Sequence, residues 1–304
     1  MCGVRVTSRR LSLWSYVAGC LLIIVCPPVW AEERLEVGQH FRDCPVCPEM
    51  VVIPAGEITV KLSNDLGEII STYTLHISNN FAIAVHETRV ADWENCEFDG
   101  VCGQVTLNSL SNKTDFGWRE WKGTRPVGNV SWSESLSYAI WLSSRTGKKY
   151  WLPSEVEWEY AARGGGAEER PWVGLNELSC KFSNLGDHDG CSDRYKGASP
   201  VGSYGANRYG LYDMLGNVSE WTTSCSGNRL VSSSGHSLVL GREYWGDDIK
   251  LLDFGRDMNG CNAMVYRGGA WSSTVGEVGF SSRATLPRGE ILETLGFRVV
   301  RSIQ

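Results

Sequence analysis

Several features are absent or scarce in this sequence. Residues 262–304 contain no cysteine, although the chain of 304 residues has eleven. Charged residues make up only 21% of the chain, and 35 acidic residues outnumber 29 basic ones. The net charge of −6 argues against nucleic acid as a partner, because nucleic-acid-binding domains present basic surfaces. No internal repeat or low-complexity block is present, and disorder is not expected beyond the N-terminus.

The sequence is instead rich in tryptophan and glycine. Thirteen Trp, 34 Gly and 42% hydrophobic residues predict one large, loop-rich domain, in which glycine supplies turns and tryptophan supplies buried surface. The histidines show no metal-ligand spacing, so each is expected on the surface or in a loop. They are His40, His76, His86, His188 and His236.

The N-terminus has the pattern of an export signal. Three arginines at positions 5, 9 and 10 precede an apolar run at 11–25, and residues 29–31 offer a cleavage site. We therefore expect a signal peptide at 1–31, a leader at 32–48 and one domain at 49–304, in a periplasmic or secreted protein. A lipoprotein is the alternative, because residues 17–20 fit a lipobox ending at Cys20, although residues 21–25 stay apolar. Membrane attachment would require lipidation at Cys20 or an uncleaved leader.

Removal of the signal would leave an even number of cysteines, eight, which predicts disulfides in an exported chain. Short polar loops favour three pairs: Cys96 with Cys102, Cys180 with Cys191, and Cys225 with Cys261. Cys44 and Cys47 could form a redox dithiol, but no strand-turn-helix pattern surrounds them, so a tethering disulfide is favoured. A four-cysteine zinc site is less favoured still, since no second close pair exists.

Regular structure is predicted mainly in the first half of the chain. Short strands are expected at 49–56, 73–77 and 81–85. A helix is expected at 131–145, where Ser131 and Glu134 form a capping box and Gly147 ends the pattern. A second helix should begin at Ser154 and stop at 164–166. Residues 165–268 are mostly turns, which need disulfides or oxygen-ligated cations to hold them.

Five motifs along the chain resemble the formylglycine-generating enzyme (sulfatase-modifying factor) family. They are MVVIPAG at 50–56, RPVGNVSW at 125–132, LPSEVEWEYAARG at 152–164, GLYDMLGNVSEW at 210–221, and the C-terminal pair of RGGAW at 267–271 with GFR at 296–298. The resemblance implies that family's fold, a compact α+β domain related to C-type lectins with little regular structure.

The resemblance also implies two calcium ions held by oxygen ligands. The first site would use the side chains of Asn184 and Asp193 and the carbonyls of Leu185 and Tyr195. The second would use the side chains of Asp213 and Glu220 and the carbonyls of Gly216 and Val218. The first site is less well matched, because residues 186–192 form an insertion. The alternative is that these acids only cap turns in glycine-rich loops.

Catalysis is where the sequence departs from the family. Its oxidases carry two copper-binding cysteines in the C-terminal segment, and these would fall near Ser273 and Val278 here. No alignment of this segment supplies a thiol, so copper is not expected. Ser219 also replaces an aromatic residue that the family often has. Ser273, Glu277 and Arg283 remain as candidate groove residues, since a carboxylate near an arginine can support acid–base chemistry.

These observations predict a binding or accessory protein of the cell envelope. Variable loops at 92–119 and 224–261 would face a protein or glycan partner, with Tyr244 and Trp245 as anchors. The alternative is an oxidoreductase that uses other groups in the same groove, because relatives in this superfamily catalyse oxidations and some act in siderophore maturation.

Overall fold

A computed structural model describes residues 34–63, 69–104, 123–165, 182–186, 195, 197–225 and 263–303. By its internal contacts the chain divides into two units, 1–34 and 35–304, and the second is described below. Its helices are α1 (Val90–Phe98), α2 (Trp132–Thr146) and α3 (Glu155–Arg163). Its strands are β1 (His40–Phe41), β2 (Met50–Ile53), β3 (Gly56–Ser63), β4 (Ile69–Ile77), β5 (Phe81–Ala84), β6 (Tyr150–Trp151), β7 (Ser219–Cys225), β8 (Ala263–Arg267), β9 (Arg283–Pro287), β10 (Leu295–Gly296) and β11 (Val300–Ser302).

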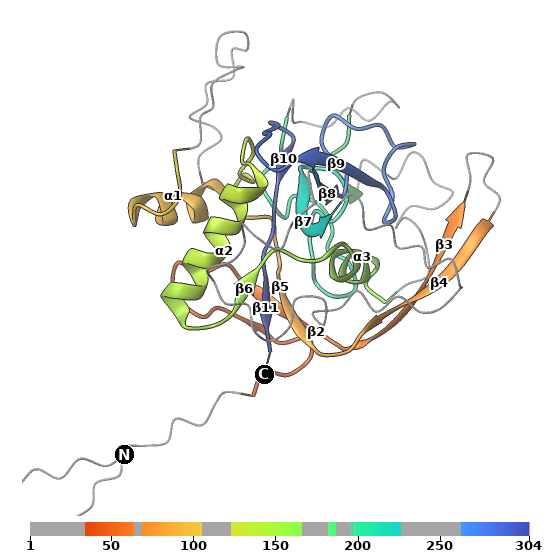
Figure 1. The fold of residues 1–304 in the computed structure, drawn as a ribbon, viewed down its shortest axis with the longest axis horizontal. Coiled ribbons are helices and arrows are strands. Elements are labelled where there is room, and N and C mark those ends of the chain that lie inside the picture. The colour runs from red at the N-terminus through yellow and green to blue at the C-terminus, as the bar shows by residue number, and fades with distance from the viewer. Residues whose placement is uncertain are drawn as a thin grey trace, which may run out of the picture. The chain divides into compact units, whose positions relative to one another are not determined.

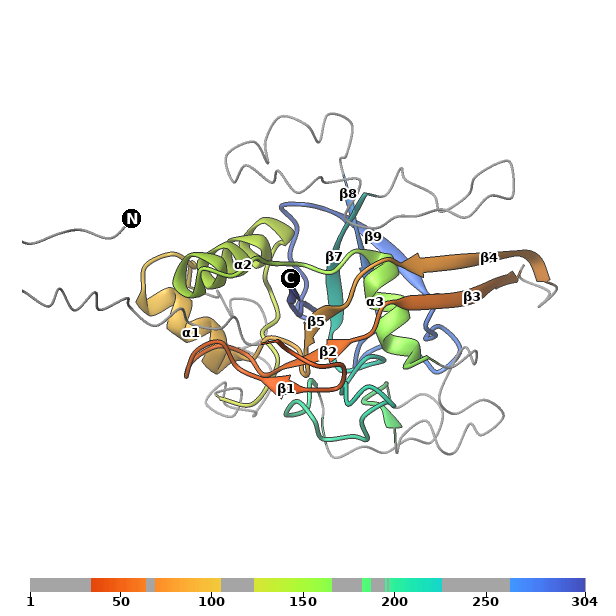
Figure 2. The ribbon, with the colours of Figure 1, turned by 90° about the horizontal axis from the view of Figure 1, so that it is seen from below.

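A five-stranded antiparallel sheet occupies the middle of this unit, with the strand order β1-β2-β5-β11-β6. Figure 1 shows α1 and α2 on one side of its strands and α3 on the other, and the view from below in Figure 2 agrees. A second sheet has the order β10-β7-β8-β9, and β3 and β4 form a separate hairpin. Mixed helices and short strands joined by long loops confirm the α+β prediction.

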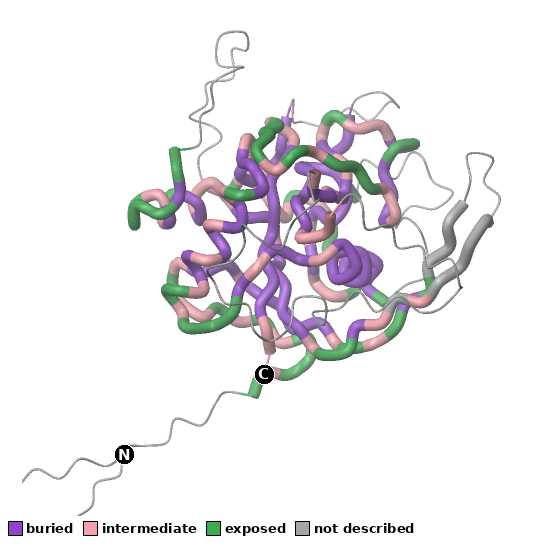
Figure 3. Tube along the Cα trace, in the orientation of Figure 1, coloured by how far each residue is buried: buried purple, intermediate pink, exposed green. Residues whose placement is uncertain are grey.

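Both faces of the central sheet are buried, which explains why β2 and β5 are apolar at every position. Met50, Ala82 and Ala84 point into a core shared with α1 and α2. Val51 and Ile83 point into a second core, shared with α3. Figure 3 shows the buried central strands and the fully buried α3. The sheet therefore separates two hydrophobic cores, and a short continuous apolar run is the pattern expected for such strands.

The two predicted helices are confirmed together with their ends. The Ser131 and Ser154 side chains each accept a hydrogen bond from the backbone of the third helical residue, and Glu134 and Glu157 complete the two capping boxes. Both helices end at a glycine in the left-handed conformation, Gly147 with φ 69° and Gly164 with φ 56°. These signals lie within the helices themselves, so they act without help from the rest of the fold.

Four expectations about regular structure were wrong or incomplete. Residues 92–119 were expected as a loop, but α1 extends through Phe98. Residues 165–268 were expected as turns, but they contain β7 and β8. The hairpin strand predicted at 73–77 begins earlier, at Ile69, and the strand predicted at 49–56 is split between β2 and β3. The predicted anchors Tyr244 and Trp245 lie outside the described residues.

Two predicted disulfides are present, Cys44–Cys47 and Cys96–Cys102. Cys225 is also disulfide-bonded, and its partner lies outside the described residues, as do Cys180, Cys191 and Cys261. Among the described helices, none is long and apolar enough to span a bilayer.

Candidate functional site

The loop that enters β7 and the start of that strand carry the four residues predicted for the second calcium site. Asp213 and Gly216 adopt left-handed conformations, with φ 55° and 81°. One carboxylate oxygen of Asp213 accepts a hydrogen bond from the Gly202 N–H at 2.6 Å, whereas the other, Oδ1, is buried without a partner. A buried oxygen with no donor is costly unless a cation or water satisfies it. This orphaned oxygen fits a cation ligand.

Glu220 is fixed at the start of β7 by a buried ion pair. Its two carboxylate oxygens each lie 2.7 Å from nitrogens of Arg298, and Trp158 Nε1 donates to Oε2 at 2.8 Å. Arg298 in turn donates to the carbonyls of Ala84, Val85 and Tyr212. The predicted ligand Glu220 is therefore already an ion-pair partner, although a carboxylate has further lone pairs to offer.

Glu87 is a third buried acid at this place, and the sequence analysis missed it. Its carboxylate accepts from Asn217 Nδ2 at 2.7 Å and from the Val218 N–H at 3.0 Å. Burial, followed by the nearby Asp213 and Glu220, raises the pKa of Glu87 well above its usual range. Glu87 follows the buried strand β5 after Val85 and His86, but no local pattern separates it from other acids near strand ends.

The charge balance around this loop favours a cation. Burial is the main cause that raises the pKa of Asp213, to about 6, and the charge of Glu220 adds to it. Three buried carboxylates, those of Glu87, Asp213 and Glu220, interact with the single guanidinium of Arg298. A divalent ion would supply the missing positive charge. It would have to bind backbone carbonyls as well, because within the described ranges no three His, Cys, Asp or Glu side chains are grouped to hold a metal.

Three of the four residues of the first predicted calcium site are described. Asn184 is buried, and its Oδ1 lacks a hydrogen-bond partner, whereas its Nδ2 donates to Gly197 O and Asn217 Oδ1 at 3.0 and 3.2 Å. The neighbouring Leu185 is buried. The Arg125 guanidinium lies 5.5 Å from the centre of the Tyr195 ring. Asp193 lies outside the described residues, so the structure does not test whether these four residues converge.

The two positions where the family would place copper-binding cysteines lie beside the same residue, Gly269. A Cβ built on Gly269 would be 2.5 Å from Val278 Cγ2 and 3.5 Å from Ser273 Oγ. Val278 is fully buried, and Ser273 Oγ accepts a hydrogen bond from the Ala270 N–H at 3.0 Å. A hydroxyl in a local turn and a packed isopropyl group occupy the two positions that the resemblance assigns to the cysteines.

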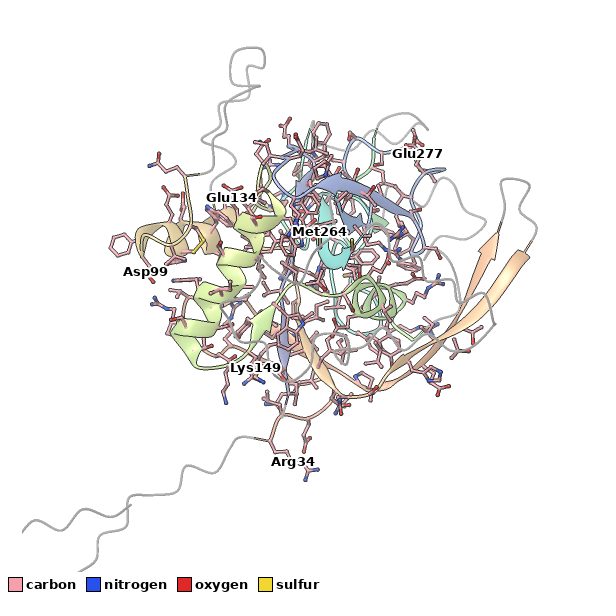
Figure 4. The ribbon with its side chains drawn as sticks, viewed as in Figure 1. Arg34, Asp99, Glu134, Lys149, Met264 and Glu277 are labelled. Atoms are coloured by element: carbon pink, nitrogen blue, oxygen red, sulfur yellow. A yellow bond between two sulfur atoms is a disulfide. The ribbon has the colours of Figure 1, made fainter. Side chains whose placement is uncertain are left out.

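The other groove candidates, Glu277 and Arg283, have described contacts of their own. Glu277 is exposed at the edge of the molecule, and its side chain accepts from the Thr274 N–H at 2.9 Å (Figure 4). Arg283 pairs with Glu155 of α3, with 2.9 Å between Nε and Oε2. Glu277 and Arg283 thus have different described partners, and an acid–base role for Ser273, Glu277 and Arg283 stays a prediction.

Arg283 belongs instead to a buried ionic network under the second sheet. The signature residue Arg267 contacts both Glu155 and Glu159 of α3, and its guanidinium lies 5.5 Å from the centre of the Trp158 ring. Arg163 also pairs with Glu159, at 2.7 Å. Ion pairs thus link the C-terminal motif to the α3 motif, so Arg267 has a structural role.

Among the described histidines, His86 is the one whose surroundings clearly change its pKa. It stacks on Tyr212 with 4.9 Å between ring centres. Burial and the charge of Arg298 lower the pKa of His86 to about 4. The unfolded chain would take up this proton near pH 6.5, so the stability that neutral His86 contributes is complete above pH 6.5 and is lost as the pH falls toward 4.

We therefore expect a pH-dependent difference between the wild type and His86→Phe, which keeps the stacked ring but cannot be protonated. Between pH 7 and pH 4 the wild type should lose about 1–2 kcal/mol more than the variant, a figure reduced for the partial exposure of the ring. Urea unfolding at both pH values measures it. An equal loss in the two proteins would show that His86 is not held neutral.

Comparisons with known proteins agree with the fold described above. Residues 37–303 match the family described as sulfatase-modifying factor enzyme 1-like domain. Over 105 residues the chain is 42% identical to the formylglycine-generating enzyme of Thermomonospora curvata, and this covers 32% of each protein. Over 106 residues it is 41% identical to the inactive C-alpha-formylglycine-generating enzyme 2 of Bos taurus, covering 33% of each. The matched part thus spans about a third of these curated relatives.

Among solved structures, that of PvdO from Pseudomonas aeruginosa matches with a TM-score of 0.67 and 29% identity. The match covers 88% of this chain and 99% of PvdO. The near-equal identities to an active and an inactive relative mean that overall similarity does not decide the activity. The residues of the site have to decide it.

Proposed function

Because the chain belongs to the sulfatase-modifying factor enzyme 1-like family, we propose that it is an exported, calcium-stabilised member that acts as a binding or accessory protein of the cell envelope. The pair Ser273 and Val278 carries this proposal. Thiolates bind Cu(I) because they are soft ligands, and neither a hydroxyl nor an isopropyl group replaces them. Formylglycine formation by the copper route is therefore not expected.

Two calcium ions are proposed as the stabilising ligands. Asn184, Leu185, Asp193 and Tyr195 would hold the first, and Asp213, Gly216, Val218 and Glu220 the second. The orphaned oxygens of Asn184 and Asp213 support one ligand in each site. When bound, a calcium ion would neutralise buried carboxylates and tie together loops that have little regular structure.

Export is supported by the cysteines. Cys44–Cys47, Cys96–Cys102 and the bonded Cys225 are disulfides, which persist mainly in oxidising compartments. This agrees with the proposed signal at 1–31. Attachment to the membrane would again depend on lipidation of Cys20 or an uncleaved leader.

A binding role is supported by exposed apolar residues in the predicted variable loop at 92–119. The side chains of Phe98 and Val101 are 93% and 51% exposed, and the Cys96–Cys102 disulfide closes the loop that carries them. Large apolar residues on a constrained loop lose little conformational freedom on binding. We propose that this loop contributes to contact with an envelope protein or glycan.

Removal of calcium should lower the melting temperature of the purified mature protein. At a calcium concentration of 100 times Kd, binding stabilises the fold by about 2.7 kcal/mol, so a chelator should lower the midpoint by about 5–10 °C. Asp213→Asn, which keeps a residue tolerant of positive φ, should reduce this shift, whereas Glu94→Gln on the exposed face of α1 should leave it unchanged. A melting midpoint that is the same with and without the chelator would contradict both ion sites.

An oxidoreductase with non-cysteine groups is the second candidate, for protein or siderophore maturation. Similarity to the hercynine oxygenase of Mycolicibacterium smegmatis, 37% identical over 139 residues, favours it because that relative is named as an oxygenase. Metal analysis of the same preparation separates the two candidates. Calcium alone supports the binding protein. Stoichiometric copper or iron, or oxygen consumption with conversion of a cysteine-containing peptide to its aldehyde, supports the oxidoreductase.

A further inference from the structure

Strand β9 forms one edge of the second sheet. The strand order is β10-β7-β8-β9, so β9 pairs with β8 on one side only. Four of its five residues are exposed, and the tube at the place of β9 is mostly green in Figure 3. Among the described residues outside β8, only Glu290 shares a backbone hydrogen bond with β9, donating to Pro287 O at 3.0 Å in the turn that follows. Such an edge offers its backbone groups to another strand.

Pro287 shows which backbone groups face the open edge. It pairs with Ala263 of β8, but it has no N–H and so cannot exchange both bonds of a hydrogen-bonded pair. Pro287 therefore occupies a non-hydrogen-bonded position of the ladder between β8 and β9. Because the two kinds of pair alternate along an antiparallel ladder, Thr285 and Arg283 occupy such positions as well. Their N–H and C=O groups point away from β8, toward the open edge.

The middle of this edge carries no charge. Proteins often keep an edge strand unpaired with a charged side chain or a bulge. The three central residues, 284–286, are uncharged, and the pairing of β9 with β8 runs without a register shift. Arg283 directs its guanidinium to Glu155 of α3, with 2.9 Å between Nε and Oε2. Only Pro287, at the end of the strand, limits further pairing.

The outward-facing groups of β9 are arranged symmetrically about Thr285. If a second copy of β9 lies antiparallel with Thr285 opposite Thr285, Arg283 of each copy lies opposite Pro287 of the other. The N–H and C=O groups of the two Thr285 residues then pair, and each Arg283 N–H reaches a Pro287 carbonyl. Like charges do not face each other along the strands, and threonine pairs across strands are favourable. The edge is therefore complementary to itself.

From this pattern we propose that β9 is a homodimer interface, where two copies of this chain join their four-stranded sheets edge to edge. A two-fold axis between the paired threonines relates the copies, which is the commonest symmetry of soluble oligomers. Ile291 and Leu292, which are 42% and 38% exposed, follow the turn after β9 and would add apolar surface at the ends of the paired strands. This proposal depends on neither calcium nor export.

A charge exchange at position 285 tests the interface and its register. By sedimentation equilibrium the wild type should dimerise in the micromolar range, because a short strand edge buries less than a standard interface of about 1,600 Å². Thr285→Lys and Thr285→Glu each place like charges opposite each other, so each should raise the dissociation constant at least about tenfold. An equimolar mixture of the two variants should form heterodimers with about the wild-type affinity, since opposite charges then meet.

Ser144→Lys and Ser144→Glu are the matched controls. Ser144 is exposed on α2, which does not belong to the second sheet, so both variants should dimerise like the wild type, alone and mixed. Thr285 is exposed as well, so its variants should keep the urea unfolding midpoint of the wild type at concentrations where the wild type is monomeric. That measurement separates a lost interface from a damaged fold.

Three results would overturn the proposal. A wild type that stays monomeric at the highest concentration reached would exclude the homodimer and leave the edge to a strand of another protein. A dimer of equal affinity in the variants of Thr285 and of Ser144 would place the interface elsewhere. A dimer that each charge at 285 abolishes, but that the mixture does not restore, would contradict the register centred on Thr285. The calcium sites are tested by the chelator experiment, so the two proposals fail separately.

Discussion

Replacement of Arg298 by methionine is expected to lower the free energy of unfolding by about 3–5 kcal/mol, the usual result of removing one partner of a buried ion pair. Arg298 is fully buried and holds both oxygens of Glu220 at 2.7 Å. Without it, Glu220, Glu87 and Asp213 would share one buried region with no positive side chain to balance them. Three backbone carbonyls would also lose a donor.

Arg145→Met provides the control for this change. Arg145 also forms a short ion pair, 2.6 Å from Asp99, but the two side chains are 40% and 34% exposed. Exposed pairs contribute about 0–1 kcal/mol, so the variant should unfold at nearly the wild-type urea concentration. Equal losses of unfolding free energy for Arg298→Met and Arg145→Met would show that the buried ion pair stabilises the fold no more than the exposed one.

Gly216→Ala should have the second large effect, a loss of about 2–4 kcal/mol. Gly216 has a φ of 81°, which costs a residue with a Cβ about 1–2 kcal/mol. The new methyl group would also overlap the Asn184 carbonyl oxygen and lie 2.6 Å from Ser183 Oγ, and such overpacking costs about 1–3 kcal/mol. Because both neighbours are backbone or closely held, they cannot move aside cheaply.

Calorimetric melting of Gly216→Ala beside Gly205→Ala tests this account. A Cβ on Gly205 would meet no heavy atom within 4 Å, so the control substitution should change the midpoint little. In calcium the Gly216 variant should also show a smaller stabilisation, since its carbonyl is a proposed ligand. A Gly216→Ala protein as stable as the control would mean that the two loops are not packed together as described.

The parts of the fold that could be predicted are those whose causes are local. The ends of α2 and α3 follow from capping boxes and terminal glycines a few residues apart. Helix α1 was missed because its first turn is closed by Asp92, which accepts from both the backbone N–H and the guanidinium of Arg89, so no serine or threonine marks its start. β7 was missed because Ser219 and Thr222 are polar, and the sequence does not show that both are buried in the protein.

The candidate site shows the same division. The calcium site at 213–220 was proposed from the family resemblance of this segment and stays a prediction, whereas the groups that surround the segment come from distant sequence. Glu87 lies 130 positions from Asn217, and Arg298 lies 78 positions from Glu220. Residues so far apart in the sequence cannot be connected by a local sequence pattern. The expectation that copper is not bound required only the absence of cysteine, and it stays a prediction. The structure adds that a Cβ on Gly269 would lie near both Val278 and Ser273.

The place of β11 in the central sheet has a consequence for biosynthesis. This strand lies between β5 and β6, and it is made of residues 300–302. While the ribosome is still translating, the nascent chain has a gap there, with the inner edges of β5 and β6 unpaired and Glu220 without Arg298. Productive folding of this sheet must therefore wait until residues 298–302 have emerged, and a factor that shields unpaired strands during that interval would act on exposed edges of this sheet.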